Sequence, residues 1–478
     1  MNRARSLARL ADERFDVLVI GGGATGLGTA LDATARGYRT ALIEAADFAS
    51  GTSSRSTKLV HGGVRYLQQG NLHLVREALH ERERLRRNAP HLVHEQRFVV
   101  PAYSWPALAY YGAGLAAYDA LAGRTAFMHS RLASSRRARE LFPALRDGGL
   151  RGALLYSDGA FDDARLAIAL ARSADERGAA LANYVRVTGF IYDGARIAGV
   201  HAFERESETP LAIRARVVIN AAGSFVDAVR TLDDPHAPPI LTHSRGSHLV
   251  VAGDALGDPR AALLVPKTSD GRVLFAVPWH GHVVIGTTDV PVDAPVDDPQ
   301  PTDDEVAYIL ATVNAYLARP LTRGDVLATF AGLRPLVDRG AASTARQSRE
   351  HVVLRCPSGL VTIAGGKWTT YRIMARDAVD AAARTASLAD VPSPTEELVL
   401  RDDPAPELRT LAAADPSLAG PLHPHLPYTG AEVVHAVRAE MARTADDVLA
   451  RRTRAAFLNE AAAAQARPTV ERLIAAYR

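Results

Sequence analysis

The sequence predicts a mixed α/β (α+β) protein with three parts: a Rossmann-like domain on a parallel sheet, a second domain on an antiparallel sheet, and a small C-terminal helical domain. A strand–glycine–helix–strand pattern over residues 15–44 predicts the first part. Two apolar segments around a short turn, over residues 272–286, predict a hairpin in the second part. Residues 408–478 are rich in alanine and arginine with helical spacing, most clearly over 430–459, and predict the third part.

Residues 15–20 form a short apolar run with β-branched side chains, which is typical of a buried parallel strand. A G-x-G-x-x-G motif follows directly, and a helix of small residues is expected over 27–36. In this motif Gly21 permits the tight turn, Gly23 lets the backbone approach a pyrophosphate, and Gly26 lets the helix pack on the sheet.

A second strand, residues 40–44, ends at Glu44, where a carboxylate can accept hydrogen bonds from ribose hydroxyls. The start of the intervening helix, with Ala24 and Thr25 in its turn, offers N–H groups and a partial positive charge to phosphate. The pattern therefore predicts a dinucleotide site. It leaves FAD and NAD both open, while the carboxylate at Glu44 argues against NADP.

Residues 49–67 differ from an NAD-binding Rossmann domain, which would continue through further βαβ units. Hydroxyl side chains at Ser53, Ser54 and Ser56 precede Lys58 among residues with permissive backbones. Such a segment can wrap the second side of a pyrophosphate and then a flavin ring.

The same segment resembles the T-S-S-x-S-x-K-L-x-H-G-G-x-R-Y-L hallmark of the FAD-dependent glycerol-3-phosphate dehydrogenases in the D-amino-acid-oxidase-like superfamily. Further segments resemble this family's motifs in the same order. These segments are residues 81–92, 156–166, 218–223, 246–251, 278–279, 285–289, 332–336 and 365–372. A lone G-x-G-x-x-G is weak evidence, but this ordered set covers most of the chain.

The resemblance implies an FAD enzyme that oxidises sn-glycerol 3-phosphate to dihydroxyacetone phosphate by hydride transfer to flavin N5 and passes the electrons to a quinone. Two alternatives keep the fold: an oxidase that reduces oxygen, and a flavin-binding protein without turnover. The residues expected to bind the cofactor are Gly21, Gly23, Ala24, Thr25, Gly26, Glu44, Ser53, Ser54, Ser56, Lys58, Leu59, His61, Gly62, Val185, Ala222, Gly223, Gly366, Lys367, Trp368 and Thr369.

Alcohol oxidation removes a hydride and a hydroxyl proton, so it needs a base or a cationic site, and a phosphate group calls for arginine. The predicted catalytic residues are His61, Arg334 and Lys367. The matching motifs and the resemblance imply Arg65, Tyr66, His248, Arg334 and Arg349 as substrate-binding residues, with Arg346 as a rival to Arg349. Structural roles compete with these assignments: a hydrogen bond for His61 or His248, and an ion pair for Arg334.

A second strand–glycine–helix unit is expected near residue 365, with a strand over 360–364 and a helix from Thr369 to about residue 383. The start of that helix can face the part of a flavin where negative charge gathers on reduction. Of the 56 basic residues only three are lysines, Lys58, Lys267 and Lys367. Two of them fall inside the flavin motifs, where a compact ammonium and a planar guanidinium are not equivalent.

The expected organisation follows the motifs. The predicted parts are a basic N-terminal segment (1–14), a discontinuous FAD-binding domain (15–95, 150–230 and 350–385), a substrate-binding cap domain (96–149 and 231–349), a linker (386–407) and the helical domain (408–478). Within the cap domain Thr302 and Glu305 form a capping box that opens a helix to residue 317.

The 478 residues are 47% hydrophobic and 23% charged, which is typical of a globular chain. The single cysteine excludes an internal disulfide, suits a reducing compartment and leaves no multi-cysteine metal site; we predict no metal. A scattered net charge of +3 argues against a nucleic-acid partner. We expect no secretory signal, and no apolar stretch reaches the roughly 18–20 residues that span a bilayer.

Residues 107–121 are the most apolar window and predict either an interfacial helix or a buried one. The resemblance implies peripheral attachment to the cytoplasmic face of the inner membrane, with the arginine-rich residues 1–14 as an aid on anionic lipid. A homodimer is a candidate assembly.

Overall fold

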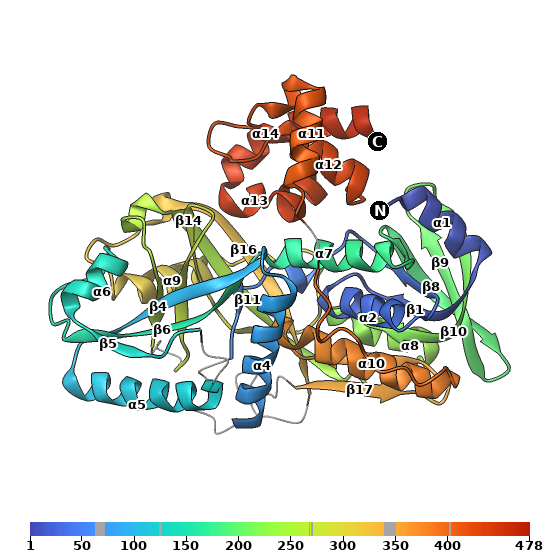
Figure 1. The fold of residues 1–478 in the computed structure, drawn as a ribbon, viewed down its shortest axis with the longest axis horizontal. Coiled ribbons are helices and arrows are strands. Elements are labelled where there is room, and N and C mark those ends of the chain that lie inside the picture. The colour runs from blue at the N-terminus through green and yellow to red at the C-terminus, as the bar shows by residue number, and fades with distance from the viewer. Residues whose placement is uncertain (63–71, 124–126, 267, 269–270, 339–349, 401–402) are drawn as a thin grey trace.

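Two sheets and a C-terminal cluster of helices make up the protein (Figure 1). The computed structural model describes residues 1–62, 72–123, 127–266, 268, 271–338, 350–400 and 403–478. The mixed α/β fold predicted from the sequence is confirmed. Among the described residues, none of the helices combines the length and apolar character needed to cross a membrane.

Within the described residues, the first sheet has eight strands around a parallel centre. In spatial order they are β17 (His351–Arg355), β18 (Val361–Gly365), β10 (Thr209–Asn220), β1 (Arg14–Ile20), β2 (Thr40–Ile43) and β7 (Ala180–Ala182), with the hairpin β8 (Val185–Asp193) and β9 (Arg196–Glu204) paired to β10. Strand β1 pairs in parallel with both β2 and β10. The predicted strands 15–20, 40–44 and 360–364 are therefore confirmed, each within a residue of its expected bounds.

Both faces of β1 are buried, as a parallel central strand requires. Val17 and Val19 join the core under helices α2 (Ala24–Ala35), α7 (Asp163–Glu176) and α10 (Tyr371–Ala386). Leu18 and Ile20 face the other core, which contains residues of the β8–β9 hairpin and of α8 (Val226–Asp233). The continuous apolar run in the sequence therefore reflects burial on two faces.

The part of the second sheet that the structure describes has ten strands and is mostly antiparallel. Its strands are β15 (Val290–Val292), β11 (Leu241–Ala252), β14 (His282–Gly286), β13 (Leu274–Trp279), β12 (Ala262–Val265), β4 (Val93–Ala102), β6 (Gly152–Phe161) and β3 (Leu59–Val60), with β16 (Val326–Val337) on β11 and β5 (Arg131–Ala133) on β6. The hairpin predicted over 272–286 is confirmed as β13–β14.

Helices cover both faces of the second sheet. One face carries α6 (Ser135–Leu141) and α9 (Asp303–Asn314), and the other carries α5 (Trp105–Ala122), with α4 (Leu72–Asn88) beside it (Figure 1). The predicted capping box at Thr302 and Glu305 is confirmed. Helix α9 ends at Asn314 rather than 317, because the Asn314 amide exchanges two hydrogen bonds with the backbone of Leu321.

The C-terminal domain lies over the junction of the two sheets (Figure 1). Its helices are α11 (Ala405–Ala414), α12 (Gly430–Ala439), the π-helical turn η9 (Asp447–Arg452), α13 (Ala455–Leu458) and α14 (Glu460–Tyr477). The helical spacing over 430–459 does not form one helix. The chain breaks after α12, where Met441 adopts a positive φ of 57° and the Asp447 carboxylate accepts hydrogen bonds from the backbone of Arg443 and Thr444.

Two further helices bear on the sequence predictions. The basic N-terminal segment forms α1 (Arg3–Asp12), which packs near the β8–β9 hairpin, far from α5 (Figure 1). Helix α5 is not a buried helix: Trp105 and Tyr110 are 65% and 62% exposed, while Leu115 and Tyr118 are buried against the sheet. Residues 107–121 therefore have the exposed surface that an interfacial helix requires, and the prediction of a buried helix is wrong.

Candidate functional site

The glycine turn between β1 and α2 has the shape that a pyrophosphate needs. Gly21 has a φ of 111°, and a Cβ on Gly26 would lie 1.9 Å from the carbonyl oxygen of Gly21. Helix α2 has Gly23 as its N-cap, without a side-chain hydrogen bond to the helix. Its first N–H, on Ala24, donates to Ser53 Oγ at 2.9 Å. The backbone can therefore approach a phosphate closely at the start of a helix, as the sequence predicts.

Glu44 closes the same turn at the end of β2. Its carboxylate accepts hydrogen bonds from the backbone N–H groups of Gly22 at 2.5 Å and Ala46 at 2.8 Å. Burial raises the pKa of Glu44, and those backbone hydrogen bonds oppose the shift. Two oxygens have lone pairs to spare for ribose hydroxyls. Val185 lies below, with its side chain buried and its N–H donating to the carbonyl oxygen of Glu44.

The turn after β10 lies against the first glycine turn. A Cβ on Gly21 would lie 2.5 Å from the carbonyl oxygen of Ala221. The next residues are Ala222, whose N–H donates to Asn220 Oδ1, and Gly223, which has a φ of 60°. The structure thus brings these two predicted cofactor residues to the carboxyl end of the parallel strands, the edge where such sheets bind ligands.

The cofactor loop, residues 47–58, crosses from the first sheet to the second. Ser53 receives the N–H of Ala24 on its hydroxyl and the indole N–H of Trp368 on its carbonyl oxygen, the latter at 2.9 Å. Ser56 turns toward Asp163 instead, with its hydroxyl 2.7 Å from Oδ2. Ser54 is buried. Of the three predicted serines, Ser53 is the one that joins the two glycine motifs.

Lys58 does not face a cofactor, which corrects the sequence prediction for its side chain. It is fully buried, and Nζ donates to both oxygens of Asp163 at 2.8 and 2.9 Å and to the carbonyl oxygen of Ser54 at 2.7 Å. The rings of Trp279 and Phe330 lie 5.3 and 5.0 Å from Nζ. Burial lowers the pKa of Lys58 to about 7, with a further contribution from a nearby arginine. Lys58 therefore stabilises the cofactor loop through these hydrogen bonds to Ser54 and Asp163.

The second glycine motif forms as predicted. Strand β18 ends in Gly365, Gly366 follows with a φ of 78°, and a 3-10 turn over Trp368–Thr370 leads into α10. Lys367 lies in this turn and is half-buried, and Thr369 is buried. A Cβ on Gly366 would lie 2.2 Å from Met374 Sδ, so the turn packs tightly on its own helix.

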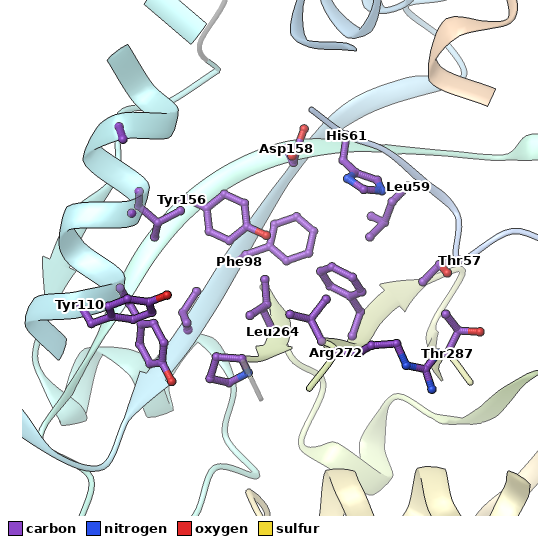
Figure 2. A pocket seen from close by; sticks show the side chains of 18 of the residues that line it. Thr57, Leu59, His61, Phe98, Tyr110, Tyr156, Asp158, Leu264, Arg272 and Thr287 are labelled. Atoms are coloured by element: carbon purple, nitrogen blue, oxygen red, sulfur yellow. The ribbon is translucent and has the colours of Figure 1, made fainter. Parts of the chain in front are cut away.

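A cavity of about 400 Å³ lies between the second sheet and α5 (Figure 2). Its polar end is formed by Thr57, His61, Arg272, Thr287 and Arg334. Figure 2 shows the first four of these residues across the cavity from Tyr110 of α5. The remaining wall is mostly apolar and is lined by Leu59, Phe98, Val100, Tyr110, Tyr111, Leu115, Tyr156, Leu264, Val273 and Phe275, among others.

Arg334 extends from β16 into the polar end. Its Nη2 donates to Thr287 Oγ1 at 3.0 Å, and Nη1 lies 3.4 Å from Asp289 Oδ1. Arg272 approaches the other oxygen of Asp289 at 3.7 Å. Two guanidinium groups therefore share one carboxylate, which leaves a positive excess at this end of the cavity.

Sequence reasoning missed Arg272, although a signal was present. The β13–β14 pairing sets Phe275 opposite Gly286. Continuing that antiparallel register places residue 272 opposite residue 289, so the predicted hairpin already implied an Arg272–Asp289 pair at its open end.

His61 lines the polar end and is half-buried, with its ring 6.4 Å from that of Phe275. Gly62 packs on Tyr118, whose hydroxyl would lie 2.4 Å from an added Cβ. That hydroxyl donates to Asp158 at 2.8 Å, and burial followed by this carboxylate raises the pKa of Tyr118 well above its ordinary value. The wall behind His61 is therefore closely packed and holds a neutral tyrosine.

His248 does not line the cavity, which corrects its prediction as a direct substrate ligand. It is 2% exposed on β11, stacks on Phe330 and places Nε2 2.9 Å from Thr57 Oγ1. Burial, with the charges of Lys58 and Arg334, lowers the pKa of His248 well below its usual 6.5. A neutral His248 therefore orients Thr57, which does line the cavity. Four predicted site residues, Arg65, Tyr66, Arg346 and Arg349, and the third lysine, Lys267, lie outside the described residues.

Comparison with known proteins agrees with this geometry. The family model described as "FAD dependent oxidoreductase" matches residues 16–372, and the model described as "C-terminal domain of alpha-glycerophosphate oxidase" matches residues 403–478. The first covers well over half of the chain and includes both glycine motifs and the cavity.

Relatives of high similarity include mitochondrial glycerol-3-phosphate dehydrogenases. The chain is 42% identical to the mouse protein over 96% of its own length and 70% of the relative's. It is 40% identical to the Arabidopsis thaliana protein over 98% of its own length and 84% of the relative's.

Solved structures give the same result. The glycerol-3-phosphate dehydrogenase of Bacillus halodurans in complex with FAD has a TM-score of 0.78 and 32% identity, and the match covers 99% of this chain and 92% of that one. An L-α-glycerophosphate oxidase of Mycoplasma pneumoniae, at 17% identity and a TM-score of 0.62, over 82% of this chain and 100% of that one, shares the fold. FAD rather than NAD is therefore the cofactor, and the chain belongs to the FAD-dependent oxidoreductase family and, within it, to the glycerol-3-phosphate dehydrogenases.

Proposed function

We propose that this enzyme oxidises sn-glycerol 3-phosphate to dihydroxyacetone phosphate and that the electrons pass to a quinone. The observation that carries the proposal is the polar end of the cavity, where Arg334 and Arg272 share the carboxylate of Asp289. That positive excess attracts a phosphate group, and guanidinium groups bind its oxygens through paired hydrogen bonds.

The same end of the cavity offers groups for the alcohol. His61 lines it and is half-buried, and we assign it the removal of the hydroxyl proton at a ring nitrogen. Arg334 and Thr287 lie within hydrogen-bonding distance of each other and present donors to an alkoxide that forms there. His248 holds Thr57 in place through a 2.9 Å hydrogen bond.

FAD fits the two glycine motifs. The turn at Gly21 and Gly23 and the start of α2 would hold the pyrophosphate, Glu44 the ribose, and the turn around Lys367 the flavin end. When bound, FAD supplies flavin N5 as the acceptor of the hydride from C2 of the substrate. Lys367 adds a positive charge where negative charge develops.

The apolar part of the cavity supports an apolar electron acceptor. A three-carbon phosphate ester makes little use of the surface formed by Phe98, Val100 and Leu264, whereas a quinone ring and its tail can pack there. Tyr110 and Tyr111 carry the same surface outward along α5.

We further propose that α5 contacts the cytoplasmic face of the inner membrane. Trp105 and Tyr110 are exposed on it, and Arg131 is exposed on β5 at the same end of the second sheet (Figure 1). Aromatic and basic side chains together suit an anionic lipid surface. Helix α1 lies at the other end, so residues 1–14 do not belong to this surface. A homodimer stays a prediction.

Addition of substrates to the yellow enzyme without oxygen tests the proposal. We expect glycerol 3-phosphate to bleach the flavin and a short-chain quinone to restore the colour. The variant Arg334→Gln should keep its FAD and require more glycerol 3-phosphate, while Arg260→Gln, on an exposed arginine, should behave as wild type.

The other outcomes decide against the proposal. Bleaching by glycerate or an amino acid in place of glycerol 3-phosphate would make the substrate assignment wrong. A flavin that no substrate bleaches would indicate a binding protein, and reoxidation by oxygen but not by quinone would indicate an oxidase.

A further inference from the structure

Arg454 connects the C-terminal domain to the cofactor loop. It lies between η9 and α13, and its side chain is 1% exposed. Its Nη2 donates to the carbonyl oxygen of Ser54 at 2.7 Å and to Asp163 Oδ1 at 3.1 Å. The ring of Phe457 lies 4.7 Å from the guanidinium carbon. Because these partners surround a rigid guanidinium, Arg454 fixes the position of Ser54.

Lys58 meets the same two groups from the other side. Its Nζ donates to the carbonyl oxygen of Ser54 at 2.7 Å and to Asp163 at 2.8 Å. One carbonyl oxygen and one carboxylate are thus held by two buried cations. Lys58 comes from the loop itself, whereas Arg454 comes from the C-terminal domain, so the cluster is complete only when that domain is docked.

The start of the cofactor loop is held by the same domain. Asp47 is fully buried and receives hydrogen bonds from Arg451 Nε at 2.6 Å and from Arg452 Nη1 and Nη2 at 2.8 and 2.9 Å. The C-terminal domain therefore grips the loop at two points, Asp47 and Ser54. Breaking a buried charged pair on one side leaves the other charge without compensation, so such contacts hold geometry strongly.

The part of the loop near these two points, from Ser53 to Thr57, contacts both glycine motifs and the cavity. Ser53 receives the first N–H of α2, on Ala24, and the indole of Trp368 from the second glycine motif. Thr57 lines the cavity and is held by His248. A displaced Ser54 would move its neighbour Ser53 and disturb both glycine motifs together.

We propose that Arg454 is a positioning residue for FAD: through it the C-terminal domain holds the cofactor loop in the conformation that binds the cofactor. This assigns a task to a domain that lies apart from both glycine motifs and from the cavity. The proposal depends on FAD binding and not on the choice of substrate or acceptor.

The full-length chain tests this by FAD titration. FAD is released from wild type and from Arg454→Met, whose side chain can still pack against Phe457, and the apoproteins are titrated with FAD by flavin fluorescence. Since a hydrogen bond from a charged group is lost, we expect Arg454→Met to bind FAD about tenfold more weakly or worse. We also expect an altered visible circular dichroism spectrum of the bound flavin.

Two further variants separate positioning from general loss of structure. Arg454→Lys keeps the charge with fewer donors and should recover part of the affinity. Arg443→Met breaks another contact between that domain and the rest of the chain, the 2.9 Å pair with Glu206, without touching the cofactor loop, and should leave FAD affinity unchanged.

The result that would overturn the proposal is wild-type FAD affinity in Arg454→Met, or an equal loss in Arg443→Met. If Arg454→Met does not fold, Arg454→Lys decides: weaker FAD binding in a folded protein supports the proposal, and unchanged binding refutes it.

Discussion

Arg334 can occupy its position in the cavity because the neighbouring residue, Gly246, has no side chain. A Cβ on Gly246 of β11 would lie 2.2 Å from Nη2 of Arg334, which extends from the paired strand β16. The obstructing atoms are the tip of a flexible side chain. An added methyl group would therefore displace the guanidinium and leave the two strands paired.

Gly246→Ala is accordingly expected to lower kcat/KM for glycerol 3-phosphate about 10- to 100-fold, by displacing a charged hydrogen-bond donor of the substrate. FAD content and the melting temperature should remain close to wild type. Gly189→Ala is the matched control, because a Cβ there meets nothing within 4 Å. Steady-state kinetics measure the effect, and wild-type kinetics in Gly246→Ala would mean that Arg334 does not bind the substrate.

At the level of single residues the sequence predicted which segments form the site better than it predicted where side chains point. Lys58 stands in a flavin motif, yet its positive φ of 64° turns the chain so that Nζ meets Asp163. No spacing rule relates residue 58 to its partner at 163, which Arg454 also binds. His61 and Arg334, by contrast, both line the cavity: His61 directly follows β3, and Arg334 lies within β16, inside the 332–336 motif that the sequence already singled out.

Among the elements, α5 combines two surfaces in one helix. Leu115 and Tyr118 face the sheet, whereas Trp105 and Tyr110 are mostly exposed. The sequence could not choose between an interfacial and a buried helix, because an apolar composition fits both. The structure decides between the two, because it shows which side chains of α5 the rest of the chain leaves exposed.

We expect the double variant Trp105→Ser with Tyr110→Ser to bind anionic lipid vesicles about tenfold more weakly than wild type, since apolar area no longer enters the interface. Vesicle co-sedimentation measures binding. Tyr192→Ser, which alters an exposed aromatic side chain on β8, is the control. Equal binding of all three proteins would refute membrane contact through α5.

Elements defined by local rules were predicted well, and those shaped by distant charges were not. The capping box at Thr302 and the β13–β14 hairpin depend on neighbours in sequence. The π-helical turn within residues 430–459 depends on the distant Asp47, which pairs with Arg451 and Arg452. Periodicity alone cannot show such a turn.

For the whole molecule, the ion pairs of Asp47 help to hold the C-terminal domain against the rest of the protein. Burial would raise the pKa of Asp47, but Arg452 and Arg451 outweigh burial and lower it from 3.8 to about 2. A carboxyl group with a lowered pKa stabilises the folded state above its ordinary pKa, and this contribution is lost as the pH falls through the folded value.

We therefore expect Asp47→Asn to reduce the free energy of unfolding at neutral pH, and the difference from wild type to shrink as the pH falls from about 4 toward 2. Denaturant titrations at a series of pH values measure this difference. Asp446→Asn, which removes an exposed partner of Arg467, should have a small effect at every pH. A difference that does not change with pH would show that the charge of Asp47 is not what matters.

The contact between Ser54 and Arg454 also has a consequence for the order in which the protein matures. The two residues are 400 positions apart. During synthesis Ser54 therefore cannot bind Arg454 until the C-terminal domain has been made and has folded. Nascent chains that stop short of this domain would then carry both glycine motifs and still retain little flavin. FAD would then bind only after nearly the whole chain has been synthesised, so bound FAD would indicate that folding is complete.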